Sequence, residues 1–384
     1  MSLGEVEAKP PVDAGIQRCS PPSMPRIASR AASLAAAAAL ALALAAPAPV
    51  RAAPPTAPAP QACADLACLD RRIATLEEEI ESQRLVHDEI LKRIDDVLWF
   101  DRVGDVASVD KVYLTGPPDP NAEETYGIKN ERHPFKFWSY VFVPRKLGRD
   151  RAPLVVLPHG GVHADFTTYH AHIVRELVEQ GYVVVAPEYR GSTGYGKSYE
   201  QAIDYGGLEI RDVVAARDWA VENLPQVDGR RVAIVGWSHG GLIALMAAFD
   251  HPDKFQACFA GVPVSDLVQR MGYLTDDYRA LFSARHHIGK TANEAVDEYR
   301  RRSPAWNAAK LRTPLLVHAT TNDRDVNVIE VQSLVAQLQA AGKKFRHRIW
   351  EDAPGGHSFD RIDTKLAREA RAEIWAFLAE HLRK

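Results

Sequence analysis

Ser238 stands in a setting that favours nucleophilic chemistry. It is the central residue of Gly236-Trp237-Ser238-His239-Gly240, which follows a predicted strand at 231–235 and precedes a helical pattern from Leu242. A G-x-S-x-G turn between a strand and a helix exposes the serine hydroxyl, and its glycines let the helix approach the strand. The sequence therefore predicts that Ser238 is a catalytic nucleophile. The alternative is a glycine-rich turn whose serine only caps the helix.

A serine nucleophile needs a general base and an acid that orients the base. In an open parallel sheet these groups belong in loops at the carboxyl ends of later strands, in the order acid, then histidine. Asp323 follows the apolar run 315–318, and Asp325 is its competitor two residues later. His357 lies in a glycine-containing loop after the run 345–350. We predict Asp323 as the acid, with Asp325 as the alternative, and His357 as the base.

The oxyanion of a tetrahedral intermediate needs hydrogen-bond donors. The backbone N–H of His239, directly after the predicted nucleophile, is the first candidate. The second is expected in the loop after the run 154–157, where Gly160 and Gly161 let the backbone approach a bound oxygen. We predict the N–H of Gly161 as this second donor, and the alternative is that the glycine pair is a plain turn.

The elements that position these residues alternate along the chain from residue 139. The predicted strands are 140–143, 154–157, 183–186, 232–235, 257–262, 315–318 and 345–350. The predicted helices between and after them are 168–180, 208–223, 242–250, 328–341 and 364–382. This pattern predicts an α/β fold in which helices cover both faces of a mainly parallel central sheet. The polar and aromatic stretch 266–303 predicts a helical excursion, and no repeat indicates a β-propeller.

The N-terminal part differs from the rest of the chain in its residue composition. Two arginines, an apolar run at 34–46 and the small residues around Ala52 are typical of a secretory signal peptide that starts at Met24. The alternative is an uncleaved helix that is amphipathic or anchors the chain to a membrane. The 13-residue run is short for a bilayer span. After cleavage of the signal peptide, the mature form is expected to have no membrane span. We therefore predict export to the periplasm or the medium.

Apolar residues at spacings of three and four predict a long amphipathic helix over 69–98. This helix is expected to be a stalk or packing element, with self-association as the alternative. The whole sequence then divides into an upstream extension and signal peptide at 1–52, an Ala/Pro-rich linker at 53–68, a helical segment and connector at 69–136, and a catalytic domain at 137–384.

The charge and the cysteines indicate which partners and cofactors the chain is expected to bind. The net charge of −3 and the absence of a basic block argue against a nucleic-acid partner. Cys63 and Cys68 could form a disulfide in an oxidising compartment or remain free thiols. Cys258 lies in an apolar strand and is expected in the core. No Cys/His cluster in the sequence indicates a metal, so neither a metal nor an organic cofactor is expected.

Taken together, the motifs resemble the catalytic domain of the prolyl oligopeptidase family, the S9 serine peptidases, from about residue 137 to the C-terminus. Beyond the serine turn, Asp323 and His357, the resemblance rests on Pro158–Gly161, Pro187–Gly196, Val227-Asp228 and Ser303-Pro304. It implies an α/β-hydrolase fold. It also implies that Arg190 is a buried ion-pair partner rather than a catalytic group.

Three features depart from this family's usual pattern. Only one long helix and a connector precede the domain, where family members usually carry a β-propeller. His239 replaces a frequent tyrosine after the serine, and Thr320-Thr321 replaces the usual glycine before the acid loop. The resemblance implies hydrolysis of peptide or aminoacyl amide bonds, with a peptide or small acyl compound as substrate. The alternatives are an ester hydrolase with the same residues and a non-catalytic exported binding or scaffold protein.

Overall fold

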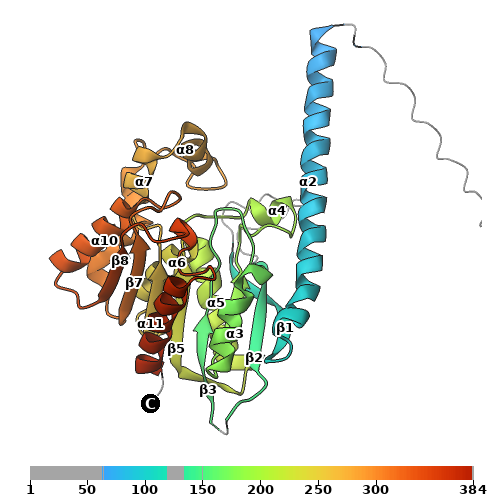
Figure 1. The fold of residues 1–384 in the computed structure, drawn as a ribbon. Helices are drawn as coiled ribbons and strands as arrows, with labels where there is room; N and C mark the ends of the chain where they lie inside the picture. The colour runs from blue at the N-terminus through green and yellow to red at the C-terminus, as the bar shows by residue number, and fades with distance from the viewer. Residues whose placement is uncertain (1–62, 64, 119–133, 149, 383–384) are drawn as a thin grey trace, which may run out of the picture. The chain divides into compact units, whose positions relative to one another are not determined.

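One mixed sheet of eight strands organises the chain (Figure 1). The computed structural model describes residues 63, 65–118, 134–148 and 150–382, so the predicted signal peptide and most of the predicted linker lie outside the described residues. The strand order is β1-β2-β4-β3-β5-β6-β7-β8. The strands are β1 (Ala107–Pro118), β2 (Pro134–Pro144), β3 (Ala152–Val156), β4 (Val183–Glu188), β5 (Val227–Trp237), β6 (Ala257–Gly261), β7 (Leu315–Thr320) and β8 (Arg346–Trp350).

The strands from β3 to β8 run parallel, and β2 pairs antiparallel with β1 and β4 at one edge. Every residue of β3, β4, β6 and β7 is buried, which explains why the sequence shows continuous apolar runs there rather than alternation. The predicted α/β-hydrolase fold with a mainly parallel sheet is therefore confirmed.

Helices cover both faces of the sheet and enclose two hydrophobic cores (Figure 1). One core joins the sheet to α5 (Leu208–Asn223), α6 (His239–Asp250) and α10 (Val328–Ala340). The other joins it to α3 (Ala171–Glu179), α11 (Lys365–Leu382) and the end of α2 (Leu66–Val103). Smaller elements are α4 (Lys197–Glu200), α7 (Leu267–Tyr273), α8 (Asp276–Ser283), α9 (Val296–Arg301) and the short 3-10 helices at 168–170, 304–310 and 356–358. Helices α7 to α9 form the excursion predicted at 266–303.

Strand β1 was not predicted, because it lies in the stretch 69–136 that was assigned to a helical segment and connector. It pairs along most of its length with β2. Its residues alternate irregularly between buried and exposed, and Asp110 and Lys111 interrupt any apolar pattern. An edge strand of this kind is defined by its pairing partner, which local sequence does not reveal.

Helix α2 docks on the domain through its C-terminal part. Trp99 is fully buried and stacks on Phe166 with ring centroids 5.3 Å apart. Lys92 is also buried, and its Nζ lies 2.6 Å from Glu188 Oε1, 3.1 Å from Asp165 Oδ2 and 2.7 Å from the carbonyl of Phe166. None of the helices in the described part of the chain is long and apolar enough to span a bilayer.

We expect Lys92→Met to lower the free energy of unfolding by about 3–5 kcal/mol, because it leaves a buried charge without its partner. Burial alone would raise the pKa of Glu188, but Lys92 and His159 hold this pKa at about 2, so Glu188 stays ionised. Urea denaturation of the full chain measures the loss. Arg93→Met on the same helix is the control, since that side chain is 81% exposed. Equal stability of Lys92→Met and wild type would contradict the expectation.

Candidate active site

Ser238 occupies a strained turn between β5 and α6. Its φ of 60° and ψ of −123° lie in a region that non-glycine residues rarely adopt. Its backbone N–H bonds the carbonyl of Gly261 at 3.0 Å, and its own carbonyl accepts the N–H groups of Gly241, Leu242 and Val264. These bonds hold the backbone in the strained conformation. The side chain then sits at the N-terminus of a buried helix, whose dipole favours developing negative charge.

Glycine is required at positions around Ser238 because neighbouring backbone and side-chain atoms approach closely there. A Cβ on Gly236 would lie 2.0 Å from the carbonyl oxygen of Gly240. A Cβ on Gly240 would lie 2.4 Å from the carbonyl oxygen of Pro158, so the turn packs directly against the loop after β3. On that loop, a Cβ on Gly160 would lie 3.2 Å from Cβ of Ser238. The structure therefore brings the serine turn and the predicted oxyanion loop together.

Asp323 and His357 meet across the loops that follow β7 and β8. His357 Nδ1 lies 2.7 Å from Asp323 Oδ2. The other oxygen, Oδ1, accepts the backbone N–H groups of Asp325 and Val326, each at 2.9 Å. Asp323 is 7% exposed, whereas Asp325 is exposed. The geometry thus favours Asp323 over Asp325 as the orienting acid.

Side-chain bonds tie the acid loop to the histidine loop. The N–H of Ala353 donates to Thr320 Oγ1 at 3.1 Å, and Asn322 Nδ2 donates to the carbonyl of Ala353 at 3.0 Å. The N–H of Asp352 donates to Thr321 Oγ1 at 2.9 Å. The two threonines that replace the family's glycine therefore join the loops that carry Asp323 and His357.

Strand topology places the predicted residues at one edge of the sheet. Gly161, Ser238, Asp323 and His357 follow β3, β5, β7 and β8, whose carboxyl ends share that edge because these strands are parallel. Gly161 has a φ of +90°, which a residue with a side chain would adopt only under strain.

The side chain of His239 points into the core. It is 1% exposed, and its ring centroid lies 4.0 Å from that of Tyr205. Only the backbone N–H of His239 is therefore available to a substrate, which is the group predicted as an oxyanion donor. The imidazole is therefore a packing group in this chain.

Two residues near the site were missed in the sequence. Asp360 Oδ2 accepts the indole N–H of Trp237 at 2.7 Å, and Arg361 donates to the carbonyl of His357. The Asp360–Trp237 bond joins the histidine loop to the serine turn, and the Arg361 guanidinium lies over the Trp237 ring, 5.6 Å from its centroid. No local motif marks them, because their partner Trp237 is more than a hundred residues away. Arg190, by contrast, forms the buried ion pair that the resemblance implied, with Nε 2.7 Å from Asp212 Oδ2.

A buried carboxyl group, Glu209, lies beneath the oxyanion region. Its Oε1 is 3.5 Å from His239 Nε2. Burial and the neighbouring Asp204 raise the pKa of Glu209 to about 8, even though the N–H groups of Gly206 and Gly207 donate to it. Burial also holds the pKa of His239 well below its usual value. Both shifts favour the neutral form of these side chains.

Because its folded-state pKa is raised, Glu209 favours the folded chain at low pH and loses this contribution as pH rises from its ordinary pKa towards about 8. We expect the Tm of wild type to fall more steeply than that of Glu209→Gln between about pH 5 and about pH 9. Calorimetry across this range measures the difference. Glu222→Gln, an exposed position on the same helix, should follow wild type. Parallel curves for wild type and Glu209→Gln would contradict the assignment.

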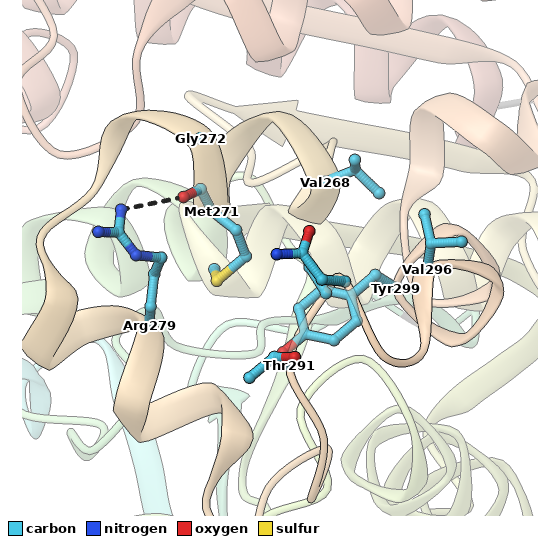
Figure 2. A pocket seen from close by; sticks show the side chains of 9 residues that line it. Val268, Met271, Gly272, Arg279, Thr291, Val296 and Tyr299 are labelled. Carbon is cyan, nitrogen blue, oxygen red and sulfur yellow. Dashed lines mark hydrogen bonds between the residues drawn. The ribbon is translucent and has the colours of Figure 1, made fainter.

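A cavity of 460 Å³ lies within the helical excursion (Figure 2). Val268, Met271, Val296 and Tyr299 give it apolar walls. Arg279 borders it and donates to the carbonyl of Met271 at 3.2 Å, the bond drawn in Figure 2. None of its lining residues is one of the predicted catalytic residues, so this cavity belongs to the excursion itself.

Comparisons with known proteins identify similar peptidases. The chain is 27% identical over 236 residues to the acylamino-acid-releasing enzyme of Rattus norvegicus, a match that covers 59% of this chain and 31% of that enzyme. It is 29% identical over 255 residues to dipeptidyl aminopeptidase BIII of Pseudoxanthomonas mexicana, covering 64% and 36% of the two chains. The chain thus spans about a third of the length of these curated relatives.

The fold is similar to that of solved peptidases. The acylaminoacyl peptidase of Pyrococcus horikoshii superposes with a TM-score of 0.60 at 19% identity, covering 75% of this chain and 44% of that one. The model of the prolyl oligopeptidase family matches residues 168–384, which is more than half of the chain. With a strained serine turn, an acid–histidine pair and this family match in one domain, the chain belongs to the prolyl oligopeptidase family of serine peptidases.

Proposed function

We propose that the protein hydrolyses peptide or aminoacyl amide bonds through an acyl-serine intermediate. The observation that carries this proposal is the 2.7 Å hydrogen bond between Asp323 and His357, at the same edge of the sheet as the strained Ser238. The relatives named as acylamino-acid-releasing enzyme and dipeptidyl aminopeptidase support an amide substrate.

In the proposed reaction, Ser238 Oγ attacks the substrate carbonyl while His357 Nε2 takes the hydroxyl proton. Asp323 accepts the Nδ1–H of His357, which keeps Nε2 free as the base. The N–H groups of His239 and Gly161 bind the resulting oxyanion. The intermediate then expels the amine, which takes the proton from His357, and leaves an ester on Ser238. Water activated by the same histidine hydrolyses this ester and restores the serine.

The substrate class is tested by comparing anilides with esters. Purified protein should hydrolyse aminoacyl and N-acyl-aminoacyl anilides, and a peptide library should report the preferred residues. The inactive variant Ser238→Ala is the control for contaminating peptidases. Turnover of short-chain aryl esters with no anilide cleavage would overturn the peptidase proposal in favour of an ester hydrolase.

A fluorophosphonate probe tests whether the site reacts at all. Wild type should be labelled at Ser238, whereas Ser238→Ala should not be labelled. Absence of labelling in folded wild-type protein would favour a non-catalytic binding or scaffold role.

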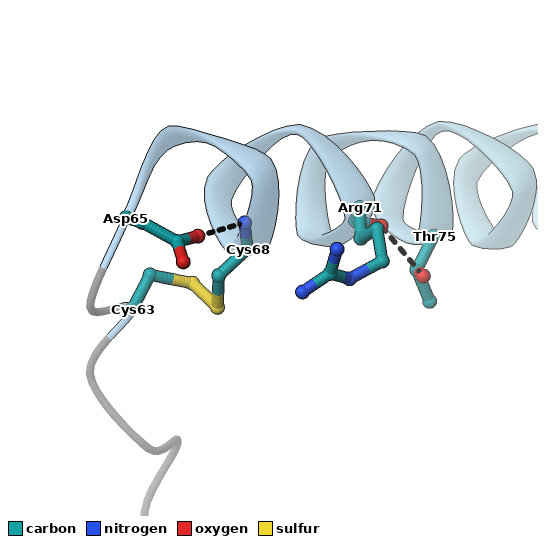
Figure 3. Close-up of a disulfide and its surroundings, with 5 residues drawn as sticks. All are labelled: Cys63, Asp65, Cys68, Arg71 and Thr75. Carbon is teal, nitrogen blue, oxygen red and sulfur yellow. Dashed lines mark hydrogen bonds between the residues drawn. A yellow bond between two sulfur atoms is a disulfide. The ribbon is translucent and has the colours of Figure 1, made fainter.

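We further propose that the protein is exported. The basic, apolar and small-residue regions before Ala53 support this, as does the disulfide between Cys63 and Cys68 at the head of α2, whose Cα atoms are 5.4 Å apart (Figure 3). Structural disulfides persist in oxidising compartments and are rare in the cytosol. Fractionation followed by N-terminal sequencing should give a periplasmic or secreted protein that begins at Ala53. An uncleaved cytosolic protein would refute export.

A further inference from the structure

Three histidines from two distant segments converge beside the predicted oxyanion loop. His163 lies two residues after Gly161, and His286 and His287 lie between α8 and α9. One ring nitrogen of each lies within 4.8 Å of the others. The Nε2 atoms of His163 and His287 are 3.3 Å apart.

This separation fits a shared metal ion. A tetrahedral zinc ion with nitrogens at about 2.0–2.1 Å holds two ligand nitrogens roughly 3.3 Å from each other. The pair His163–His287 already has that spacing. His286 is half-buried on a loop, so a modest movement of its ring brings a third nitrogen into range.

The other nitrogen of His163 is held as a donor. Nδ1 lies 3.4 Å from the carbonyl oxygen of Gly191 and 3.9 Å from Glu200 Oε1. Since these oxygens only accept, Nδ1 carries the proton, and the Nε2 lone pair points to the cluster. Metal-bound histidines usually have such an outer partner.

We propose that His163, His286 and His287 bind one divalent transition-metal ion that prefers imidazole ligands, with zinc as the first candidate and water in the fourth position. The ion joins the loop of Gly161 to the helical excursion. Its role is structural, because it holds the excursion next to the predicted oxyanion donor. The sequence does not indicate this site, because His163 and His287 are 124 positions apart.

The test is metal titration of the chelator-treated full chain. Calorimetry with Zn²⁺ should give one site per chain, and Co²⁺ should produce the visible absorption of a tetrahedral complex. Zinc should also raise the Tm of wild type, since it binds the folded state. His163→Ala and His286→Ala should each weaken binding by about tenfold or more and abolish the rise in Tm.

Two controls separate this site from other ligands. His347→Ala, at an exposed position of β8, should bind zinc as wild type does. Asp323, Asp325 and His357 also lie within metal-binding distance of one another, and His357→Ala removes that alternative. The proposal is overturned if wild type binds no zinc, or if His357→Ala abolishes binding while His163→Ala and His286→Ala retain it.

A separate observation concerns the exposed face of α2. From Leu69 to Val97, positions at alternating spacings of four and three form one stripe. The apolar members are each between 46% and 68% exposed: Leu69, Ile73, Leu76, Ile80, Ile90, Ile94 and Val97. Gln83 and His87 fill the two remaining positions. A strict period of 3.5 residues is the pattern of a coiled-coil seam, and polar residues within such a seam help to set the register.

The stripe faces away from the domain. Lys92 and Trp99 anchor α2 against the domain. They are seven residues apart, so both occupy the same heptad position, f, which lies on the side of the helix opposite the seam. A second helix can therefore pack on the stripe while each domain stays on the outer side.

Charges beside the seam favour a parallel partner of the same sequence. In a parallel, in-register pair, Arg72 faces Glu77 of the second copy, and Glu79 faces Arg84. Within its own chain, Arg84 also pairs with Glu81 and Asp88 of α2 and with Glu200 of α4. From the seam and these charges we infer that α2 forms a parallel two-stranded coiled coil with a second copy of the chain.

Sedimentation equilibrium of the full chain tests the coiled coil. Wild type should be a dimer, and the double variant Ile73→Lys/Ile80→Lys should be a folded monomer. Glu78→Lys, on the opposite face of the same helix, is the control and should remain a dimer. Leu76→Cys should cross-link to itself on oxidation, because parallel register places the two copies face to face. A monomeric wild type overturns the coiled coil, and a dimer without this cross-link overturns the parallel arrangement.

Discussion

Replacing Ser238 with alanine is expected to lower kcat for the best anilide substrate by roughly 10⁶-fold, the scale seen when a serine hydrolase loses its nucleophile. The alanine variant has no oxygen that can form the acyl intermediate, so only direct attack by water on the bound substrate remains. The oxyanion donors His239 and Gly161 stay in place and should retain a small residual acceleration. The change lies in kcat, because the substrate still binds.

Rates are measured on purified full-length variants, with active sites counted by the fluorophosphonate probe. Ser198→Ala, at an exposed position of α4, is the matched control and should stay within a few-fold of wild type. Ser238→Ala should also remain folded, and a thermal denaturation curve with a Tm close to that of wild type checks this. A variant that keeps more than a few per cent of wild-type activity would rule out Ser238 as the nucleophile.

Asp323→Asn has the second largest expected effect, a fall in kcat of roughly 10⁴-fold. The asparagine amide can donate to His357 Nδ1, which would move the ring proton to Nε2 and remove the base. Its Oδ1 can still accept the N–H groups of Asp325 and Val326, so the loop should keep its shape. The loss should therefore appear in kcat with little change in KM or Tm.

Asp325→Asn decides between the two candidate acids. Asp325 is exposed and contributes its backbone N–H to Asp323, so the amide variant should keep activity within a few-fold of wild type. The opposite pattern, with a large loss in Asp325→Asn and a small one in Asp323→Asn, would assign the acid role to Asp325.

Much of the fold and of the candidate site could be predicted because the signals are local. The buried parallel strands read as continuous apolar runs, and the glycines around Ser238 follow from contacts within one turn and its nearest loop. The order of strands and loops along the chain then selects His357 from the 14 histidines.

Other features depend on pairing between distant residues. Strand β1 is polar and irregular, and it becomes a strand only by hydrogen bonding to β2. Lys92 reads as an ordinary surface lysine of a helix, but Glu188 and Asp165 make it a buried anchor. The local sequence pattern identifies neither the pairing strand of β1 nor the acidic partners of Lys92.

The sequence by itself determined the serine turn, the α/β class and the family, because each follows from residue types at short spacing. The sequence favoured Asp323 over Asp325 by its position after a strand, and the tertiary structure added that Asp323 is the carboxylate that is buried and bonded to His357. Only the tertiary structure brought His163 to His286 and His287 and placed the stripe of α2 away from the domain. These results depend on distances between residues remote in the chain, which packing sets and sequence spacing does not.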